Sequence, residues 1–475
     1  MAEFQETGVK YVSTRGQAPE LDFEEALLTG LARDGGLYVP ASWPRLSQDE
    51  IAGFAGKSYV DVAQAVMTPF VEGAISAEEL KAMLAEAYAS FGHRAVTPLK
   101  QMGDNDWLLE LFHGPTLAFK DVAMQILARL FDHALKGKGR RLTIVGATSG
   151  DTGSAAIEAF RGRDAIDIFI LHPKGRVSEV QRRQMTTVLD DNVHNIAVDG
   201  SFDDCQALVK AMFNDMTFRD EVGLAGVNSI NWGRVMAQIV YYFTSAVALG
   251  GPARPVSYSV PTGNFGDIFA GYVAREMGLP IDKLIVATNV NDILARALNS
   301  GRYDVGTVTP TISPSMDIQV SSNFERLLFD VCDRDGPGVE RMMQQLQQSG
   351  GFGIPEGALT KARTCFAADR ADEAETNAMI RRANETTGEL VDPHTAVGLA
   401  VAERHRGDAS IPMVTLATAH PAKFPAAVEA ASGLTPALPP RMADLFEREE
   451  RLDECANDLK AIEDFIRARS RVAAA

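Results

Sequence analysis

Cysteine is scarce in this sequence, with four residues in a chain of 475. They lie far apart and show neither the close pairs that hold zinc nor the spacing of a small disulfide framework. No metal site is therefore predicted. Scattered thiols are typical of a reducing cytosol, so we expect a cytoplasmic protein. The four residues are Cys205, Cys332, Cys365 and Cys455.

Basic residues are also in deficit, because 46 lysines and arginines face 63 aspartates and glutamates and leave a net charge of −17. This balance argues against nucleic acid or an anionic membrane as a partner. Long apolar runs are lacking as well: Ile239–Leu249, the most apolar stretch, contains Thr244 and Ser245 and is too short to span a bilayer. The first residues show no basic-then-apolar signal pattern. An anionic small molecule remains compatible with this charge if its pocket is locally positive.

The length of the chain exceeds what one hydrophobic core normally serves, so two or three domains are expected. Residues 1–95 are expected to form a small N-terminal domain of helices that begins with an extended polar segment, Tyr11–Gly16. Apolar residues at i, i+3 and i+4 predict its helices. These helices are expected at Phe23–Leu31, Tyr59–Phe70 and Ala77–Tyr88.

Residues 96–440 alternate short apolar runs with longer periodic segments such as Phe202–Phe213 and Val235–Leu249. This alternation indicates parallel strands covered on both faces by helices. Gly250–Pro255 is expected to connect two such α/β lobes, and residues 321–384 to be mostly helical. The strands are predicted at Leu142–Val145, Ile166–Leu171, Val256–Val260, Leu284–Ala287 and Met413–Ala417.

Residues 441–475 are predicted to form a C-terminal helical tail. Its apolar residues fall on one stripe of a helix, which favours a tail docked on the body over a dimer seam. The protein is expected to be a monomer or a homodimer. The stripe consists of Leu445, Leu452, Leu459, Ile462 and Ile466.

Lys120 stands between an apolar segment and a helix-like run, Val122–Leu135. Leu117, Ala118 and Phe119 precede it, so its amine is expected to lie against apolar walls. Burial favours the neutral amine, and a neutral amine can attack a carbonyl carbon. The alternative is an ordinary lysine that snorkels from the end of an element.

Three predicted strands run directly into polar loops that are followed by helices, at Thr148–Gly153, Pro261–Asp267 and Thr418–Pro421. Each loop places free backbone N–H groups at a helix N-terminus, where the helix dipole also attracts anions. Ligands of parallel α/β sheets bind at the carboxyl ends of the strands, so the loops are predicted to meet at one anion-binding pocket. Neither glycine-rich loop is a GxGxxG fingerprint or ends in Gly-Lys-Ser/Thr, which disfavours dinucleotides and nucleoside triphosphates.

A reactive amine beside a phosphate cradle suggests pyridoxal phosphate, which needs an amine for its aldehyde and amide donors for its phosphate. At this point the sequence resembles the threonine synthase family in its long form, which also begins with a segment like Tyr11–Gly16. The segments that carry the resemblance are His113–Lys120, Ser149–Gly153, Thr262–Asp267 and Thr418–Pro421.

The resemblance implies an α/β protein of the tryptophan synthase β-subunit-like fold, known as fold type II. It would have two parallel-sheet lobes over residues 96–440 and an accessory N-terminal domain over residues 1–95. Serine and threonine dehydratases share this fold, but their lysine segment typically reads Ser-x-Lys-x-Arg-Gly. Here the segment reads Ala118-Phe-Lys-Asp-Val122, which counts against that group.

The resemblance also implies roles for the cofactor-binding residues. Lys120 would hold pyridoxal phosphate covalently and then act as the mobile base and acid. Thr418 would face the pyridine nitrogen, and Asp267 would cap the following helix rather than touch the phosphate as a carboxylate. The phosphate cup would be formed by Gly263, Asn264, Phe265, Gly266 and Asp267, mostly through main-chain N–H groups.

A second set of residues is implied for the substrate. The Thr148–Thr152 loop would bind the substrate carboxylate; the alternative is that this loop only caps the following helix. Cations for the substrate phosphate are expected from Arg15, Lys423 and Arg234. His113, His394 and His420 are either proton shuttles or ordinary loop residues. The carboxylate loop consists of Thr148, Ser149, Gly150, Asp151 and Thr152.

The reaction implied is a β,γ-replacement that converts O-phospho-L-homoserine and water to L-threonine and phosphate, the last step of threonine biosynthesis. Closure between the lobes is expected, to keep stray water from a reactive intermediate. Two alternatives stay open. One is another fold-type-II lyase such as a serine or threonine dehydratase, and the other is a non-catalytic protein that binds phosphate ligands.

Overall fold

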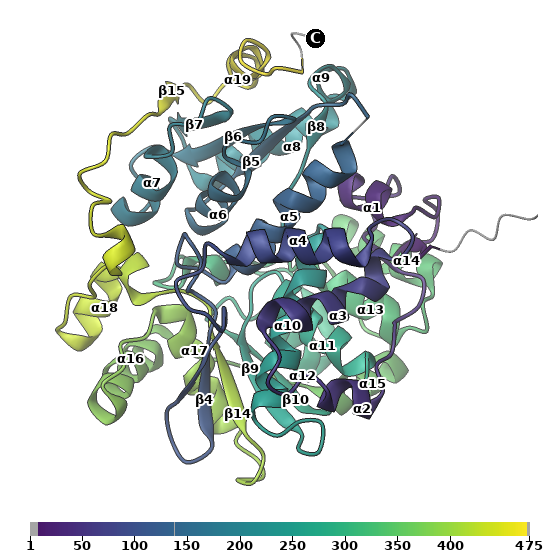
Figure 1. Cartoon of the computed structure of the whole chain (residues 1–475), viewed down its shortest axis with the longest axis vertical. Coiled ribbons are helices and arrows are strands. Elements are labelled where there is room, and N and C mark those ends of the chain that lie inside the picture. Colours follow the sequence, from purple (N-terminus) through teal and green to yellow (C-terminus); the bar gives the residue numbers. More distant parts are fainter. Residues whose placement is uncertain (1–7, 137, 473–475) are drawn as a thin grey trace, which may run out of the picture.

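Two sheets organise the protein, seen in the computed structural model of Figure 1, which describes residues 8–136 and 138–472. Residues 1–7, where a targeting signal would stand, lie outside the described residues. The larger sheet has the strand order β13-β10-β9-β14-β4-β3, and only β3 runs antiparallel to its neighbour. Its strands are β3 Leu99–Gln101, β4 Asp106–Glu110, β9 Val256–Pro261, β10 Ile281–Thr288, β13 Phe366–Arg370 and β14 Met413–Ala417.

The smaller sheet is wholly parallel and has the order β15-β7-β6-β5-β8. All five strands predicted from apolar runs are therefore confirmed as parallel strands of one sheet or the other. The strands of the smaller sheet are β5 Leu142–Ala147, β6 Ile166–Pro173, β7 Val193–Val198, β8 Leu224–Ala225 and β15 Asp453–Cys455.

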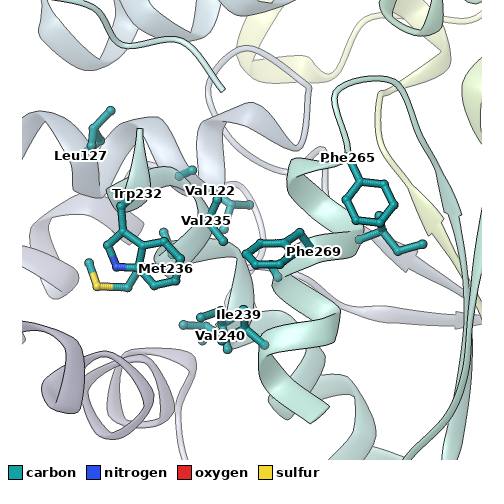
Figure 2. Packing of buried hydrophobic residues seen from close by; sticks show 14 of the residues in the cluster. Val122, Leu127, Trp232, Val235, Met236, Ile239, Val240, Phe265 and Phe269 are labelled. Atoms are coloured by element: carbon teal, nitrogen blue, oxygen red, sulfur yellow. The ribbon is translucent and has the colours of Figure 1, made fainter. Parts of the chain in front are cut away.

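Two long buried helices form the centre of the core, α5 Lys120–Leu135 and α10 Trp232–Ala248. A helix that is apolar on most of its circumference must be buried on most sides, and both helices meet this condition. α5 packs on α10 and on α6 Asp151–Phe160, and α10 packs on α11 Gly266–Glu276. Figure 2 shows Val122 of α5 and Val235 of α10 side by side in this core. Gly250–Pro255 leads from α10 into β9, and its expected role as a connector between two lobes stays a prediction.

The N-terminal helices pack on this central pair, because α3 (Tyr59–Val71) contacts α10 and α4 (Ala77–Tyr88) contacts α5. Asp22, Ser47 and Ser76 begin three of these helices with capping boxes, in which side chain and backbone satisfy each other's free donors. The extended segment forms β1 Tyr11–Ser13, paired with β2 Tyr38–Pro40. The predicted helices are confirmed as α1 Phe23–Thr29, α3 Tyr59–Val71 and α4 Ala77–Tyr88, with a short α2 Gln48–Ala52 between them.

The remaining helices cover the sheets, and residues 321–384 are mostly helical, as predicted. No described helix is both long enough and apolar enough to cross a membrane. The helices around the smaller sheet are α7 Glu179–Thr186, α8 Phe202–Asn214 and α9 Met216–Glu221. Those around the larger sheet are α12 Ile293–Ser300, α13 Phe324–Val331, α14 Gly336–Ser349, α15 Glu356–Cys365, α16 Glu373–Thr387, α17 Pro393–Arg404 and α18 Pro425–Ser432.

The prediction of one helix through the C-terminal tail is wrong. Within residues 441–472, the described part of this tail, the one α-helix is α19 Leu459–Arg467, and the stretch before it runs along the smaller sheet, yellow in Figure 1. Leu445 is buried in a separate small cluster, Arg451 donates its backbone N–H to Thr186, and β15 joins the smaller sheet beside β7. These contacts replace helical hydrogen bonds, so tertiary packing overrides the apolar stripe. The domain boundaries at 95/96 and 440/441 stay predictions.

Candidate active site

A cavity of about 470 Å³ lies at the carboxyl ends of β5, β9 and β14. The three loops predicted to converge line this one cavity, together with Lys120 and a segment near Ser315. The convergence follows from topology, because β9 and β14 are neighbours in the larger sheet while α5 and α6 bring β5 of the smaller sheet alongside.

Lys120 is the first residue of α5, and its side chain enters the cavity over the ring of Phe119, with Nζ 4.7 Å from the ring centroid. Its niche is not purely apolar, however, since Nζ lies 3.3 Å from Asp151 Oδ2. Burial lowers the pKa of the Lys120 amine below its usual value. The Asp151 carboxylate opposes that shift, and the cations of Lys423 and Arg234 add to it.

The Thr262–Asp267 loop presents unpaired backbone donors to the cavity. Within the described residues, the N–H groups of Gly263, Asn264 and Phe265 donate to no protein acceptor. The carbonyls of the loop point the other way: Ser321 Oγ donates to Gly263 O, and Asn323 holds Asn264 O. The backbone is therefore fixed with its donors inward, an arrangement that binds anions.

Phe265 is the residue that turns this loop into α11. It has a left-handed backbone with φ of 61°, which is uncommon for a residue other than glycine, and it is the N-cap of the helix without a side-chain cap. Its ring is buried in the same hydrophobic cluster as Phe269, and Figure 2 shows both rings. The packing of the ring thus stabilises the strained turn on which the donors stand.

Asp267 does not cap α11, contrary to the sequence expectation. Its carboxylate accepts hydrogen bonds from the hydroxyls of Tyr241 and Tyr242 on α10. Burial raises the pKa of Asp267 to about 7, against the lowering effect of the two hydroxyls. Oδ2 has no partner among the described residues, so the carboxyl group that lines the cavity is uncharged below about pH 7 and becomes ionised above it.

The Thr148–Thr152 loop has the same design. Thr148 Oγ1 accepts from the backbone N–H groups of Gly150 and Gly153, while those of Ser149, Asp151 and Thr152 donate to no acceptor in the described chain. Gly150 does not line the cavity; its φ of 138° favours glycine, and a Cβ at this position would lie 2.4 Å from the Gln181 side chain. The hydroxyl of Thr148 therefore binds the backbone of its own loop, as the helix-cap alternative expected. The N–H groups without acceptors face the cavity, as the carboxylate-binding role expected.

Thr418 lies in the cavity wall at the end of β14. Its carbonyl oxygen accepts the backbone N–H of Phe119, and Ala118 and Ala419 form an isolated bridge. This pairing holds the Lys120 segment against the third loop, although the two are about 300 positions apart in the sequence.

Of the three predicted cations, only Arg234 lines the cavity. Its Nη1 donates to the Val227 carbonyl, and its Nε has no partner among the described residues. Arg15 lies outside, with Nε and Nη2 each 3.1 Å from the carboxylate of Glu325. Lys423 also lies outside, fully buried, so the expectation that these two residues reach a ligand in the cavity is not supported by their positions.

The three histidines differ in position. His394 lines the cavity, with Nδ1 2.6 Å from Asp392 and Nε2 accepting the Ser315 N–H. His113 pairs with Glu110, and His420 caps its own short helix; both line a separate cavity of about 390 Å³. For His113 and His420 the positions favour the ordinary loop role.

The sequence reasoning missed several residues of the cavity wall, because they follow no predicted strand and belong to no glycine-rich motif. The only available signal for Gln238 was its polar side chain in a helix that is otherwise apolar. The missed residues are Asp203, Gln206, Asn228, Ser229, Gln238 and the segment from Pro314 to Ile318.

Comparison with known proteins identifies the family. The family models for the threonine synthase N terminus, for pyridoxal-phosphate dependent enzymes and for the threonine synthase C-terminal region match residues 10–88, 91–345 and 395–466. A threonine synthase of Pseudomonas aeruginosa is 56% identical over 459 residues, which cover 96% of this chain and 98% of that protein.

The chain belongs to the threonine synthase family. A crystal structure described as pyridoxal-phosphate-bound threonine synthase from Brucella melitensis superposes with a TM-score of 0.96 at 58% identity, covering 98% of this chain and all of that one. The yeast threonine synthase structure gives a TM-score of 0.92 at 40% identity, covering 98% and 99%. The predicted fold, fold type II, is thus confirmed, and the chain is a lyase that depends on pyridoxal phosphate.

The residues of this cavity fit the cofactor. Lys120 supplies a buried amine, and the Gly263–Phe265 amides supply donors without partners. A Cβ added at Gly263 would lie 2.6 Å from the Ser315 carbonyl oxygen, so only glycine allows the loop and the Ser315 segment to close around this space. When bound, pyridoxal phosphate supplies an aldehyde that joins an amine covalently and a ring that accepts electrons from a neighbouring carbanion.

Proposed function

We propose that this chain converts O-phospho-L-homoserine and water to L-threonine and phosphate. The observation that carries the proposal is the meeting of one buried amine and two separate sets of unpaired backbone donors in a single cavity. Two anion cradles suit a reaction in which the cofactor brings one phosphate and the substrate brings a carboxylate. The family membership supports the same reaction.

The cofactor roles follow from position. Lys120 holds pyridoxal phosphate covalently, and the N–H groups of the Gly263–Gly266 loop bind its phosphate. Thr418 presents its hydroxyl to the pyridine nitrogen. Burial of Asp267, which outweighs the two tyrosine hydroxyls, favours its uncharged form, and that form lies near the phosphate without the repulsion that a carboxylate would cause.

The substrate roles fall on the other loop and on α10. The N–H groups of Ser149, Asp151 and Thr152 orient the substrate carboxylate, and the Arg234 guanidinium attracts the substrate phosphate. Lys120, once released, takes the α-proton at Nζ and returns a proton later in the reaction. The surrounding buried side chains keep bulk water from the reacting atoms.

The test is product analysis with the purified protein. Incubation with O-phospho-L-homoserine is expected to release phosphate and L-threonine in equal amounts, and incubation with L-threonine to release no ammonia. Ammonia and a 2-oxo acid from L-threonine would instead identify a dehydratase. Lys120→Ala should retain the fold by circular dichroism yet lose both phosphate release and the borohydride-stable attachment of pyridoxal phosphate. Normal turnover by that variant would refute the assignment.

We also propose that the enzyme works in the cytoplasm as a monomer or homodimer, without nucleic-acid or membrane partners. The scattered cysteines and the net charge of −17 support this. Light scattering at micromolar concentration tests the assembly state, and a larger oligomer would contradict it.

A further inference from the structure

The carboxylate of Asp151 stands between two lysines. Oδ2 lies 3.3 Å from Lys120 Nζ, and Oδ1 lies 3.0 Å from Lys423 Nζ. Gln181 Nε2 donates to Oδ1 at 2.9 Å, and Ser315 Oγ donates to Oδ2 at 3.4 Å. All three charged groups are buried, so one negative charge faces two amines where solvent cannot compensate an excess of positive charge.

The two amines are held very differently. Lys423 Nζ has three acceptors for its three protons: the Thr116 carbonyl at 2.7 Å, Gln184 Oε1 at 3.0 Å and Asp151. Lys120 Nζ has one polar partner among the described residues, the longer contact to Asp151. Loss of a proton from Lys423 would leave a buried acceptor unpaired, whereas Lys120 has protons without an acceptor in the described chain and can lose one while it keeps its hydrogen bond to Asp151.

Other charged groups face this cluster from the packed elements. Arg234 of α10 adds positive charge near Lys120, and Asp267 of α11 adds little negative charge while it stays neutral. His394 of α17 interacts with Asp151, and Asp121 of α5 interacts with Lys423. Burial acts to raise the pKa of Asp151, but the two lysines outweigh it and hold that pKa well below its usual range. Asp151 is therefore a permanent anion.

We infer that Lys423 is a positioning residue: it holds the Asp151 carboxylate as its own counter-ion, so that Lys120 is the amine of the two that gives up its proton and becomes free to react. The inference rests on the proposed role of Lys120 as the amine that attaches the cofactor. It replaces the role in binding substrate phosphate that the sequence suggested for Lys423, which does not line the cavity.

The test measures cofactor attachment rather than threonine formation. The full chain is stripped of pyridoxal phosphate, the cofactor is added back over pH 6–10, and attachment is trapped with borohydride and mapped to Lys120. In Lys423→Met, the carboxylate pairs with Lys120 alone. The pH midpoint of the attachment rate is expected to rise by at least one unit, which makes attachment at pH 7 about tenfold slower. Lys423→Arg, which keeps the charge, should stay close to the unsubstituted chain.

The double variant Lys423→Met/Asp151→Asn separates charge from packing. Without the Asp151 carboxylate, no negative charge at this position stabilises the protonated amine of Lys120. The pH midpoint of cofactor attachment should therefore return to the value of the unsubstituted chain or fall below it. A purely structural role would make the double variant worse than the single one. If Lys423→Met does not fold, Asp151→Asn alone should lower the midpoint. An unchanged midpoint in Lys423→Met, or no recovery in the double variant, overturns the inference. If the unsubstituted chain attaches no cofactor at Lys120, the proposed function falls with it.

Discussion

The ring of Phe265 meets the ring of Phe324 edge-on, with 5.3 Å between the centroids. Phe265 joins the backbone donors of Gly263 and Asn264 to the first residue of α11, so this contact ties the cradle of backbone donors to α13. A residue whose backbone is strained is held in place by what its side chain contacts.

Phe265→Ala should therefore lower the free energy of unfolding by about 3–5 kcal/mol, the usual cost of removing a buried phenylalanine ring. The left-handed backbone, with φ of 61°, is strained to a similar degree for alanine and for phenylalanine. The difference in unfolding free energy between the two proteins therefore measures the contribution of the ring. Urea denaturation measures the effect. Phe446→Ala is the matched control because that ring is 43% exposed, and it should change stability by less than about 0.5 kcal/mol. Equal effects at the two positions would contradict the anchoring role.

Gly150 offers a second test of loop geometry. Its φ of 138° is accessible only to glycine, and an added Cβ would come within 2.4 Å of the Gln181 side chain. Gly150→Ala is expected to destabilise the protein by about 1–3 kcal/mol and to raise KM for the substrate, since the loop amides lose their alignment. Gly357→Ala is the control: a Cβ there meets nothing within 4 Å, in a helix, and should be neutral or slightly stabilising. Melting temperatures of the two variants and of the parent decide the matter.

Much of this fold could be predicted because its strands are short apolar runs between helical segments. Met413–Ala417 is a strand over the predicted residues, and Tyr59–Phe70 is a helix within one residue. Strands that are buried on both faces are apolar at every position, so they can be recognised without knowing which strands pair with them. The loops at the strand ends could also be predicted, because glycine and hydroxyl residues mark sharp turns.

What failed depended on contacts between distant segments. Leu445 and Leu452 fit a helical stripe, but packing on the smaller lobe keeps their segment out of a helix. Asp267 looks like a helix cap in its local sequence, yet two tyrosines of α10, about 25 positions earlier, bind its carboxylate. Local sequence contains no information on such partners.

Asp267 leads to a prediction about pH. Its pKa in the folded protein, about 7, lies above the ordinary value near 4, so between those values the folded state holds more protons than the unfolded state. The contribution of Asp267 to stability is therefore fully present below about pH 4 and is lost as the pH rises to about 7. Asp267→Asn cannot titrate and escapes this loss.

Relative to Asp267→Asn, the parent should become less stable by up to about 1.4 kcal/mol per pH unit across this window. Above about pH 8 the difference between the two should become constant. Urea denaturation of both proteins at pH 5, 6, 7 and 8 measures it. Parallel stability profiles would show that the carboxyl group is ionised throughout.

Substitution of Arg15 is expected to change stability, whereas substitution of Arg234 is expected to change substrate binding. Arg15 forms a two-pronged ion pair with Glu325 away from the cavity, whereas Arg234 lines the cavity. Arg15→Met should cost about 2 kcal/mol of stability, because it leaves the buried Glu325 carboxylate with fewer donors, and should leave KM within twofold. Arg234→Met should raise KM for O-phospho-L-homoserine by about tenfold or more, the value of one charged hydrogen bond.

Steady-state kinetics and urea denaturation of both variants test this pair. Arg15→Met/Glu325→Met should recover most of the lost stability, because a buried charge without a partner costs more than two apolar side chains of similar volume. An increase in KM for Arg15→Met at unchanged stability would show that Arg15 binds the substrate. A side chain that acts only through Glu325 cannot weaken substrate binding without also changing the stability of the fold. The comparison thus separates an arginine that holds the N-terminal segment to α13 from one that faces the reaction.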